Sequence, residues 1–263
     1  MFDLLRSFFR KWLARKAPLE LSYSKISAYR FCPWKYKLLY HDGRRVPPNP
    51  HISLGQSVHK ALEEFHKREG KTLDELLEAY DKVWVNEGFQ NPQQTQHFYE
   101  KGEKMLRQYI DWFHLRKSEV VAVEREFRFP VGTRILRGMI DRIDRLPDDT
   151  YEVIDYKTHA EMWEQSRIDS DLQLTLYSIG CRQLMKAEPS LLSYFFLAHN
   201  KVVTTARSSV QYREAIAEFE SVAEKIEAGS FPPDVSKCPR CDFKSTCAYS
   251  SDKAPKGNGK SKL

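Results

Sequence analysis

The chain has 263 residues, of which 41% are hydrophobic, 13% aromatic and 30% charged. This composition is typical of a globular protein with a sizeable core and excludes a disordered chain. No apolar run reaches the ~18 residues that a membrane-spanning helix needs, so we do not expect an integral membrane protein. The net charge of +6, from 42 Lys+Arg against 36 Asp+Glu, permits a polyanionic partner without requiring one.

Residues 1–18 have the pattern of a short basic amphipathic helix. Phe2, Phe9 and Leu13 recur at helical spacing, with arginines and lysines between them. The pattern fits first a helix that packs on the domain or frays, and second one that lies on a membrane surface or binds a partner. This stretch has neither a long apolar segment nor a cleavage site, so we do not expect a secretory signal. Residues 251–263, rich in Lys, Gly and Ser, are predicted to form a disordered basic tail.

Between these ends, residues 19–250 are predicted to form one domain that begins with helices. Ser22 or Ser24 can cap a helix that runs into Cys32-Pro33, and a proline-rich loop follows. Further helical segments are expected from Leu54 to about Arg68, near Thr72–Asn86 and at Pro92–Arg116.

The pattern then changes to that of β-strands. Val120–Phe129, Arg134–Asp144 and Tyr151–Lys157 are predicted to form a three-stranded meander. After it, we expect a helix over Asp169–Lys186, strands at Leu191–Leu197 and Val202–Ala206, and a periodic helix over Val210–Ala228 that ends at Gly229. This order predicts an α/β fold with a central mixed sheet built on the meander and flanked by helices.

The meander carries charged residues where a buried strand normally has none. Asp155 and Lys157 are two residues apart, so both side chains point to one face of their strand. Asp141 on the preceding strand can converge with Asp155 on one Mg²⁺ or Mn²⁺, because these ions prefer carboxylate oxygens. Such an ion activates water, and a nearby lysine helps to position it. From spacing alone, an Asp–Lys ion pair at the sheet end, with Asp141 capping a turn, explains the pattern about as well.

Four short motifs occur in a defined order along the chain. They are Gly55-Gln56-Ser57-Val58-His59, Gly138-Met139-Ile140-Asp141, Asp155-Tyr156-Lys157-Thr158 and Gln173-Leu174-Thr175-Leu176-Tyr177. Together they resemble the RecB-like branch of the PD-(D/E)XK nuclease superfamily over about residues 21–250. The resemblance implies a restriction-endonuclease-like core.

The same resemblance implies roles for particular residues. His59, Asp141, Asp155 and the carbonyl of Tyr156 would face Mg²⁺ or Mn²⁺, with Lys157 catalytic. Asp141 and Asp155 would be essential for catalysis as well. Gln173 and Tyr177 would support the site and its DNA strand. Many superfamily members have Glu where this chain has Asp155, but aspartate is common in the RecB-like branch.

Three of the five cysteines, Cys238, Cys241 and Cys247, lie within ten residues of one another. We interpret this density as metal ligation in a reducing cytoplasm, with Cys32 as a fourth ligand. The spacing allows either Zn²⁺ or a [4Fe–4S] cluster. The layout of one cysteine before the core and three after it resembles AddB-type nuclease domains and CRISPR-associated RecB-like exonucleases, which implies [4Fe–4S] and a cysteine-clamped helical lobe. Cys181, in an apolar helix, is predicted to be a core residue.

These expectations combine into a Mg²⁺/Mn²⁺-dependent DNA nuclease. We expect an exonuclease that acts on single-stranded DNA or duplex ends in repair, recombination or related DNA processing. The alternatives are an endonuclease and a non-cleaving DNA-binding or scaffold subunit of a larger complex. A helicase partner is implied by the resemblance, because RecB-like nucleases often work beside one.

Overall fold

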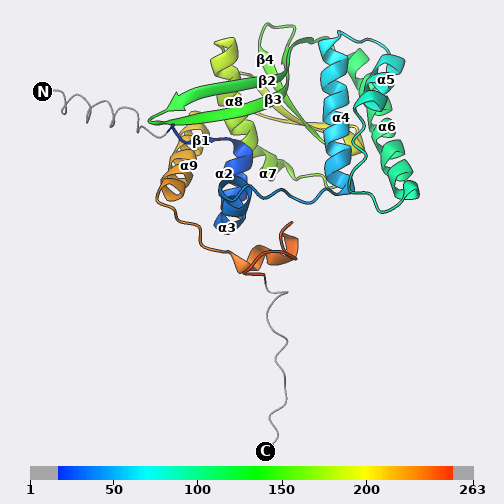
Figure 1. The fold of residues 1–263 in the computed structure, drawn as a ribbon. Coiled ribbons are helices and arrows are strands. Elements are labelled where there is room, and N and C mark those ends of the chain that lie inside the picture. The colour runs from blue at the N-terminus through cyan, green and yellow to red at the C-terminus, as the bar shows by residue number, and fades with distance from the viewer. Residues whose placement is uncertain (1–16, 251–263) are drawn as a thin grey trace, which may run out of the picture.

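Six strands form one mixed sheet in the computed structural model, which describes residues 17–250 (Figure 1). The strands are β1 (Glu20–Leu21), β2 (Glu119–Val131), β3 (Arg134–Arg145), β4 (Tyr151–Lys157), β5 (Leu191–Phe196) and β6 (Lys201–Thr205). Their order is β1-β3-β4-β5-β6, with β2 paired to β3 outside this path. The β1–β3 and β4–β5 pairs are parallel and the others antiparallel. The predicted meander and mixed sheet are confirmed, whereas the predicted N-terminal helix and basic tail lie outside the described residues.

Helices cover both faces of this sheet. They are α2 (Tyr23–Phe31), α3 (Pro33–Tyr36), α4 (Pro50–Lys67), α5 (Leu73–Val83), α6 (Pro92–Leu115), α7 (Gln165–Asp169), α8 (Leu172–Met185) and α9 (Ser209–Glu227). Shorter turns lie at Lys37–His41, Leu197–His199 and Val235–Arg240. None of the described helices is long and apolar enough to cross a membrane.

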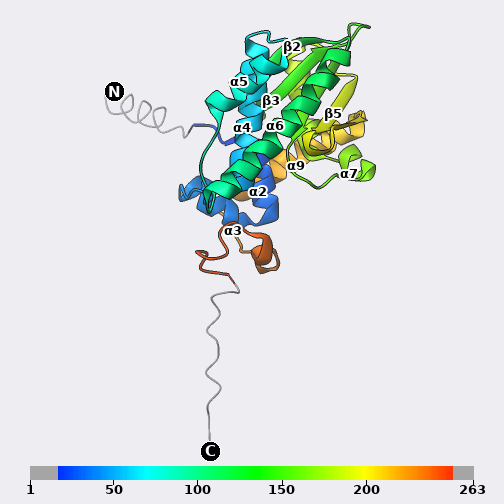
Figure 2. The ribbon, with the colours of Figure 1, turned by 90° about the vertical axis from the view of Figure 1, so that its right-hand side faces the viewer.

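The strands direct alternate side chains into two separate cores. Val153 and Phe196 belong to the core under α2, α8 and α9. Ile154 and Phe195 belong to the core under α4, α5 and α6, the side from which Figure 2 is viewed. Because both faces are covered, β4 and β5 are almost wholly buried, as expected of central strands flanked by helices.

Two helix boundaries differ from the prediction. α4 begins at Pro50, not Leu54, because the Asn49 side chain accepts hydrogen bonds from the main chain of His51 and Ile52, and proline suits the first helical position. The helix predicted over Asp169–Lys186 is confirmed as α8, but it begins at Leu172 and not at Asp169. The Asp171 side chain caps it by accepting from the main-chain nitrogen of Leu174 at 3.0 Å, and the short helix α7, which was not predicted, ends before this cap.

The chain after α9 folds beneath α2 and α3 (Figure 1). There Leu38, Phe243 and Cys247 form a small buried cluster, with Trp34 packed against it. The Trp34 ring also meets the Tyr249 ring edge-on, with 4.8 Å between centroids. We call residues 231–250 and the α3 region that they contact the cysteine lobe.

A buried arginine ties α6 to the middle of the sheet. Arg142 is fully buried, and its guanidinium donates to Asp144 Oδ2 at 2.7 Å and to the Tyr109 hydroxyl at 2.6 Å. Asp144 also accepts from Ser118 at 2.6 Å, and the Tyr109 hydroxyl lies 3.0 Å from that of Tyr156. Since its partners come from α6, β3 and β4, this network fixes helix and strands together from within.

Arg142→Ala should destabilise the protein by about 3–5 kcal/mol, because it leaves the Asp144 carboxylate buried without its main partner. The measurement is the free energy of unfolding from urea denaturation. Arg145→Ala is the matched control on the same strand, since Arg145 is half exposed and pairs with Glu119 at the surface. It should change stability little. Equal losses in both variants would contradict a dominant buried network.

Candidate functional site

A cavity of about 290 Å³ lies where β3 and β4 part. The main-chain pairing of these strands runs from Arg145–Tyr151 to Arg142–Ile154 and stops there. Asp141 and Asp155, the next residues on each strand, both line the cavity. Residues from all four sequence motifs meet in its wall, namely His59, Asp141, Asp155, Tyr156, Lys157, Gln173 and Tyr177.

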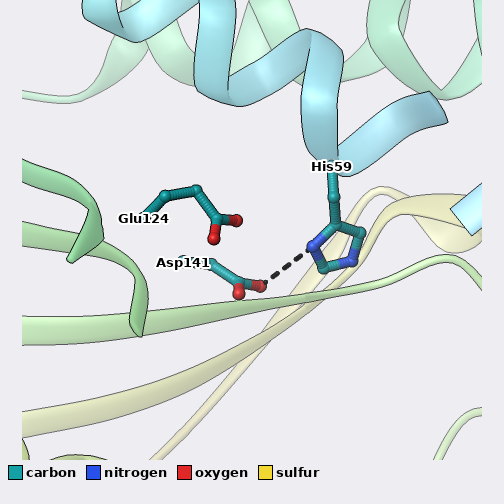
Figure 3. A group of neighbouring side chains, drawn as sticks. All are labelled: His59, Glu124 and Asp141. Carbon is teal, nitrogen blue, oxygen red and sulfur yellow. Dashed lines mark ion pairs between the residues drawn. The ribbon is translucent and has the colours of Figure 1, made fainter. Parts of the chain in front are cut away.

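Helix α4 reaches the two strands, as a ligand role for His59 requires. The His59 Nδ1 lies 3.3 Å from Asp141 Oδ2 (Figure 3). The same carboxylate oxygen accepts a hydrogen bond from the main-chain nitrogen of Tyr156 at 2.9 Å, which ties the end of β4 to β3 through a side chain. Gly55, one turn before His59, permits this approach: a Cβ there would stand 3.2 Å from the Thr158 hydroxyl oxygen.

Glu124 is a site residue that the sequence interpretation missed. Val123 pairs with Arg142 and Arg125 with Ile140, so Glu124 stands opposite Asp141. One ligand atom each from His59, Glu124 and Asp141 lies within 4.8 Å of the others (Figure 3). The acid–base alternation around Glu124 is typical of an ordinary exposed strand face. Counting the opposed residues of the two antiparallel strands back from the turn at Gly132 would have placed Glu124 across from Asp141.

Burial and mutual repulsion govern the charges of this acidic group. Burial and the charge of Asp141 raise the pKa of Glu124 to about 7. Burial and the charge of Asp155 raise the pKa of Asp141 well above its usual value. Burial lowers the pKa of His59, so the imidazole is favoured in the neutral form that binds metals. Glu124 and Asp141 therefore resist ionising together, and a neutral imidazole lies beside them. A divalent cation bound to these three groups would stabilise the ionised form of both carboxylates.

Asp155, Lys157 and Gln173 form a closed polar triangle on the other side of the cavity. The Lys157 Nζ lies 2.6 Å from Asp155 Oδ2 and donates to Gln173 Oε1 at 2.9 Å. The Gln173 Nε2 donates to Asp155 Oδ1 at 2.7 Å and to the Tyr177 hydroxyl at 3.0 Å. Burial opposes the charge of Lys157, but Asp155 and Asp141 raise its pKa overall, so the amine is a cation.

The structure also brings four cysteines from the two ends of the domain together. Cys32, Cys238, Cys241 and Cys247 line one pocket in the cysteine lobe. The main-chain nitrogen of Asp234 donates to Cys32 Sγ at 3.3 Å, which joins the end of α2 to the C-terminal segment. Within residues 17–250, no three of these sulfur atoms lie within 4.8 Å of one another. Cys181 is fully buried in the core under α8, as predicted.

Comparison with known proteins identifies the family. The model of the PD-(D/E)XK nuclease superfamily matches residues 20–248. The chain belongs to this superfamily. Its members use divalent metals, and the predicted RecB-like resemblance is confirmed.

The chain is similar to two streptococcal proteins, each named as a subunit of an ATP-dependent helicase/deoxyribonuclease. Identity is 27% over 220 residues for the protein of Streptococcus equi subsp. zooepidemicus, covering 74% of this chain and 20% of the relative. It is 23% over 184 residues for that of Streptococcus pyogenes serotype M3, covering 65% and 17%. The chain therefore spans about a fifth of the length of these relatives.

A solved structure from Eubacterium rectale, provisionally described as an exonuclease, superposes with a TM-score of 0.52. The match covers 87% of each chain at 11% sequence identity. It shows a shared fold, and the predicted restriction-endonuclease-like core with helices on both faces of a mixed sheet is confirmed.

Glu124→Gln should stabilise the metal-free protein at about pH 8 and have little effect near pH 4. Folded Glu124 keeps its proton up to about pH 7, whereas an unfolded glutamate loses it near 4.5. Between these values the unfolded state binds fewer protons, so wild-type stability falls as pH rises, and an amide avoids that loss. The melting temperature in EDTA across this pH range measures the effect. Glu126→Gln, exposed on the same strand, should follow the wild-type profile; identical profiles for wild type and Glu124→Gln would contradict the raised pKa of Glu124.

Proposed function

We propose that the chain is a Mg²⁺/Mn²⁺-dependent deoxyribonuclease, and that it degrades single-stranded DNA or duplex ends as an exonuclease. The observation that carries this proposal is that the metal-type donors His59 and Asp141 share one cavity with the Asp155–Lys157 pair. Membership of the nuclease superfamily and the description of the relatives as helicase/deoxyribonuclease subunits support it.

The donor set suits a hard divalent cation. We propose that His59, Asp141, Asp155 and the carbonyl of Tyr156 hold the ion, and Glu124 joins them because it clusters with His59 and Asp141. Carboxylate and carbonyl oxygens suit Mg²⁺ and Mn²⁺, and Mn²⁺ also accepts an imidazole nitrogen. When bound, such an ion supplies Lewis-acid polarisation of the phosphate and a more acidic water.

The remaining residues act through position and charge. Lys157 is held as a cation by Asp155 and Gln173, so it can neutralise charge that develops on the scissile phosphate. Gln173 bonds to both members of the pair and is itself held by Tyr177. We therefore assign Lys157 a catalytic role and Gln173 and Tyr177 positioning roles. Since the lysine is charged, it acts as a hydrogen-bond donor rather than as a base.

Lys157→Ala and Asp155→Asn should each reduce DNA cleavage by roughly 10²–10⁴-fold, because each removes a group that balances transition-state charge or holds the ion. The assay uses end-labelled and internally labelled DNA, single- and double-stranded, with Mg²⁺, Mn²⁺ or EDTA. Lys201→Ala and Asp148→Asn, at exposed positions outside the cavity, are the matched controls.

Three results would contradict different parts of this proposal. Wild-type cleavage rates in both cavity variants would refute the site. Binding without cleavage by the wild type on every DNA would favour the non-cleaving scaffold alternative, and internal cuts in circular DNA would favour an endonuclease over an exonuclease.

We also propose that the four cysteines hold a [4Fe–4S] cluster. The four cysteines line one pocket, which supports a shared group. The resemblance of their layout, with one cysteine before the core and three after it, to iron–sulfur nuclease domains favours the cluster over Zn²⁺. The cluster would join Cys32 to a segment more than 200 residues later, and closing so long a loop restricts the unfolded chain.

Protein purified without oxygen should be brown, absorb near ~400 nm and contain about four iron and four sulfide per chain. Cys238→Ser should lose the colour and lower the unfolding temperature. Cys181→Ser is the control, because that thiol is buried far from the other cysteines in a different core, and it should keep the colour. A colourless wild type with one zinc per chain would refute the iron–sulfur assignment.

A helicase is the proposed protein partner. This proposal rests on the relatives, whose names combine a helicase and a deoxyribonuclease and which are about five times longer than the matched region.

A further inference from the structure

A basic hollow lies outside the catalytic cavity. It has a volume of about 490 Å³ and lies between α2, the α7–α8 connection and the turn Val235–Arg240. Its charged lining residues are Arg30, Arg167, Lys237 and Arg240 against Asp171. Four cations from three separate segments thus face one space with one acid, and that acid is already engaged by the Tyr194 hydroxyl at 2.6 Å.

These cations are largely available to a ligand. Arg30 lies 3.3 Å from Glu218 and Arg167 lies 3.4 Å from Glu161, both at exposed positions where ion pairs are weak. Lys237 and Arg240 form no ion pair with any residue of the described range 17–250. The hollow therefore concentrates positive charge that the protein neutralises only in part, through the two exposed pairs of Arg30 and Arg167, which is the electrostatic pattern of an anion-binding surface.

A second hollow shares lining residues with both the basic hollow and the catalytic cavity. It measures about 320 Å³ and contains Lys25 at the N-terminal end of α2. It shares Gln173 and Tyr177 with the catalytic cavity, and it shares Tyr23 with the basic hollow. The three spaces therefore adjoin in sequence, from the Asp155–Lys157 pair to the cysteine lobe.

Aromatic rings lie close to these cations. Trp163 lines none of the three hollows, but the centroid of its ring lies 3.8 Å from the Arg167 guanidinium and 5.6 Å from the Lys157 amine. Tyr23 and Phe31 line the basic hollow itself. Cations that follow a backbone, with rings on which bases can stack, are the combination that proteins use to bind single strands.

We propose that the basic hollow binds the phosphates of a single DNA strand whose scissile phosphate lies in the catalytic cavity. The proposal rests on the proposed nuclease function and adds the path of the strand and the residues that hold it. Arg30 on α2, Arg167 on α7, and Lys237 and Arg240 in the cysteine lobe are the phosphate-binding residues. The strand runs from Lys157 over Gln173 and Tyr177, past the start of α2, to Arg240.

The test measures binding of fluorescent oligothymidylates of about 4 and about 15 nucleotides to the full chain in EDTA. Lys237→Gln/Arg240→Gln should weaken binding of the longer strand roughly 25-fold at about 0.1 M salt. It should also reduce the slope of log K against log[salt] by about 1.4, because each phosphate contact to a single strand contributes about 0.7. The shorter strand, which fills only the catalytic end, should bind as before. Arg30→Gln/Arg167→Gln, on α2 and α7, should weaken binding of the longer strand to the same extent. Because these two residues lie outside the cysteine lobe, a disturbed lobe could not explain that loss of affinity.

Lys104→Gln/Arg182→Gln removes the same charge from exposed helix positions outside these hollows and should bind both strands like the wild type. Cleavage assays distinguish a failure of the proposed strand path from a failure of the proposed nuclease function. The hollow variants should raise KM for long strands and keep kcat, because the lost contacts are equal in the ground and transition states. Wild-type affinity for the longer strand in both hollow variants, or a loss confined to duplex DNA, would overturn the proposed path. A wild type that cuts no DNA would instead refute the nuclease, while the binding measurements would still decide the path.

Discussion

The carboxylate of Asp141 lies buried between a second acid, Glu124, and a third, Asp155, and much of the structure is arranged to balance that charge. His59 approaches it from α4, and the main-chain nitrogen of Tyr156 donates to it from β4. Lys157 offsets the neighbouring Asp155. These groups come from four elements, namely α4, β2, β3 and β4, so the site exists only when sheet and helices are assembled. The remaining imbalance, seen in the raised pKa values of Glu124 and Asp141, is what a divalent cation would relieve.

Each of the two cores positions a different part of this site. The core under α4, α5 and α6 brings His59 to the strands, whereas the core under α2, α8 and α9 brings Gln173 to Lys157. The cavity lies between them, at the point where β3 and β4 separate. Because the helices pack on opposite faces, neither layer alone could complete the site. The cysteine lobe lies outside both cores and carries its own small buried cluster.

Sequence reasoning found the features that local patterns encode and missed those that depend on tertiary geometry. The three-stranded meander and the shared face of Asp155 and Lys157 follow from side-chain alternation, so they could be predicted. Glu124 could not be recognised by type, because its role comes from standing across from Asp141. β1 has two residues and therefore no periodicity to detect. The start of α8 depends on the cap of Asp171, and the short helix α7 before it lies in a mostly polar stretch with no helical periodicity to detect.

The hydroxyl contact between Tyr109 and Tyr156 has a consequence for the register of β4. Tyr156 points into the core under α6, whereas its neighbours Asp155 and Lys157 point to the other face, toward α8. A slip of β4 by a single residue would exchange the two faces and drive both charges into an apolar layer. Because Tyr156 is anchored through Tyr109 to the buried Arg142, such a slip would also break the central polar network. An anchor on the opposite face of β4 thus decides which face of the sheet carries the charges.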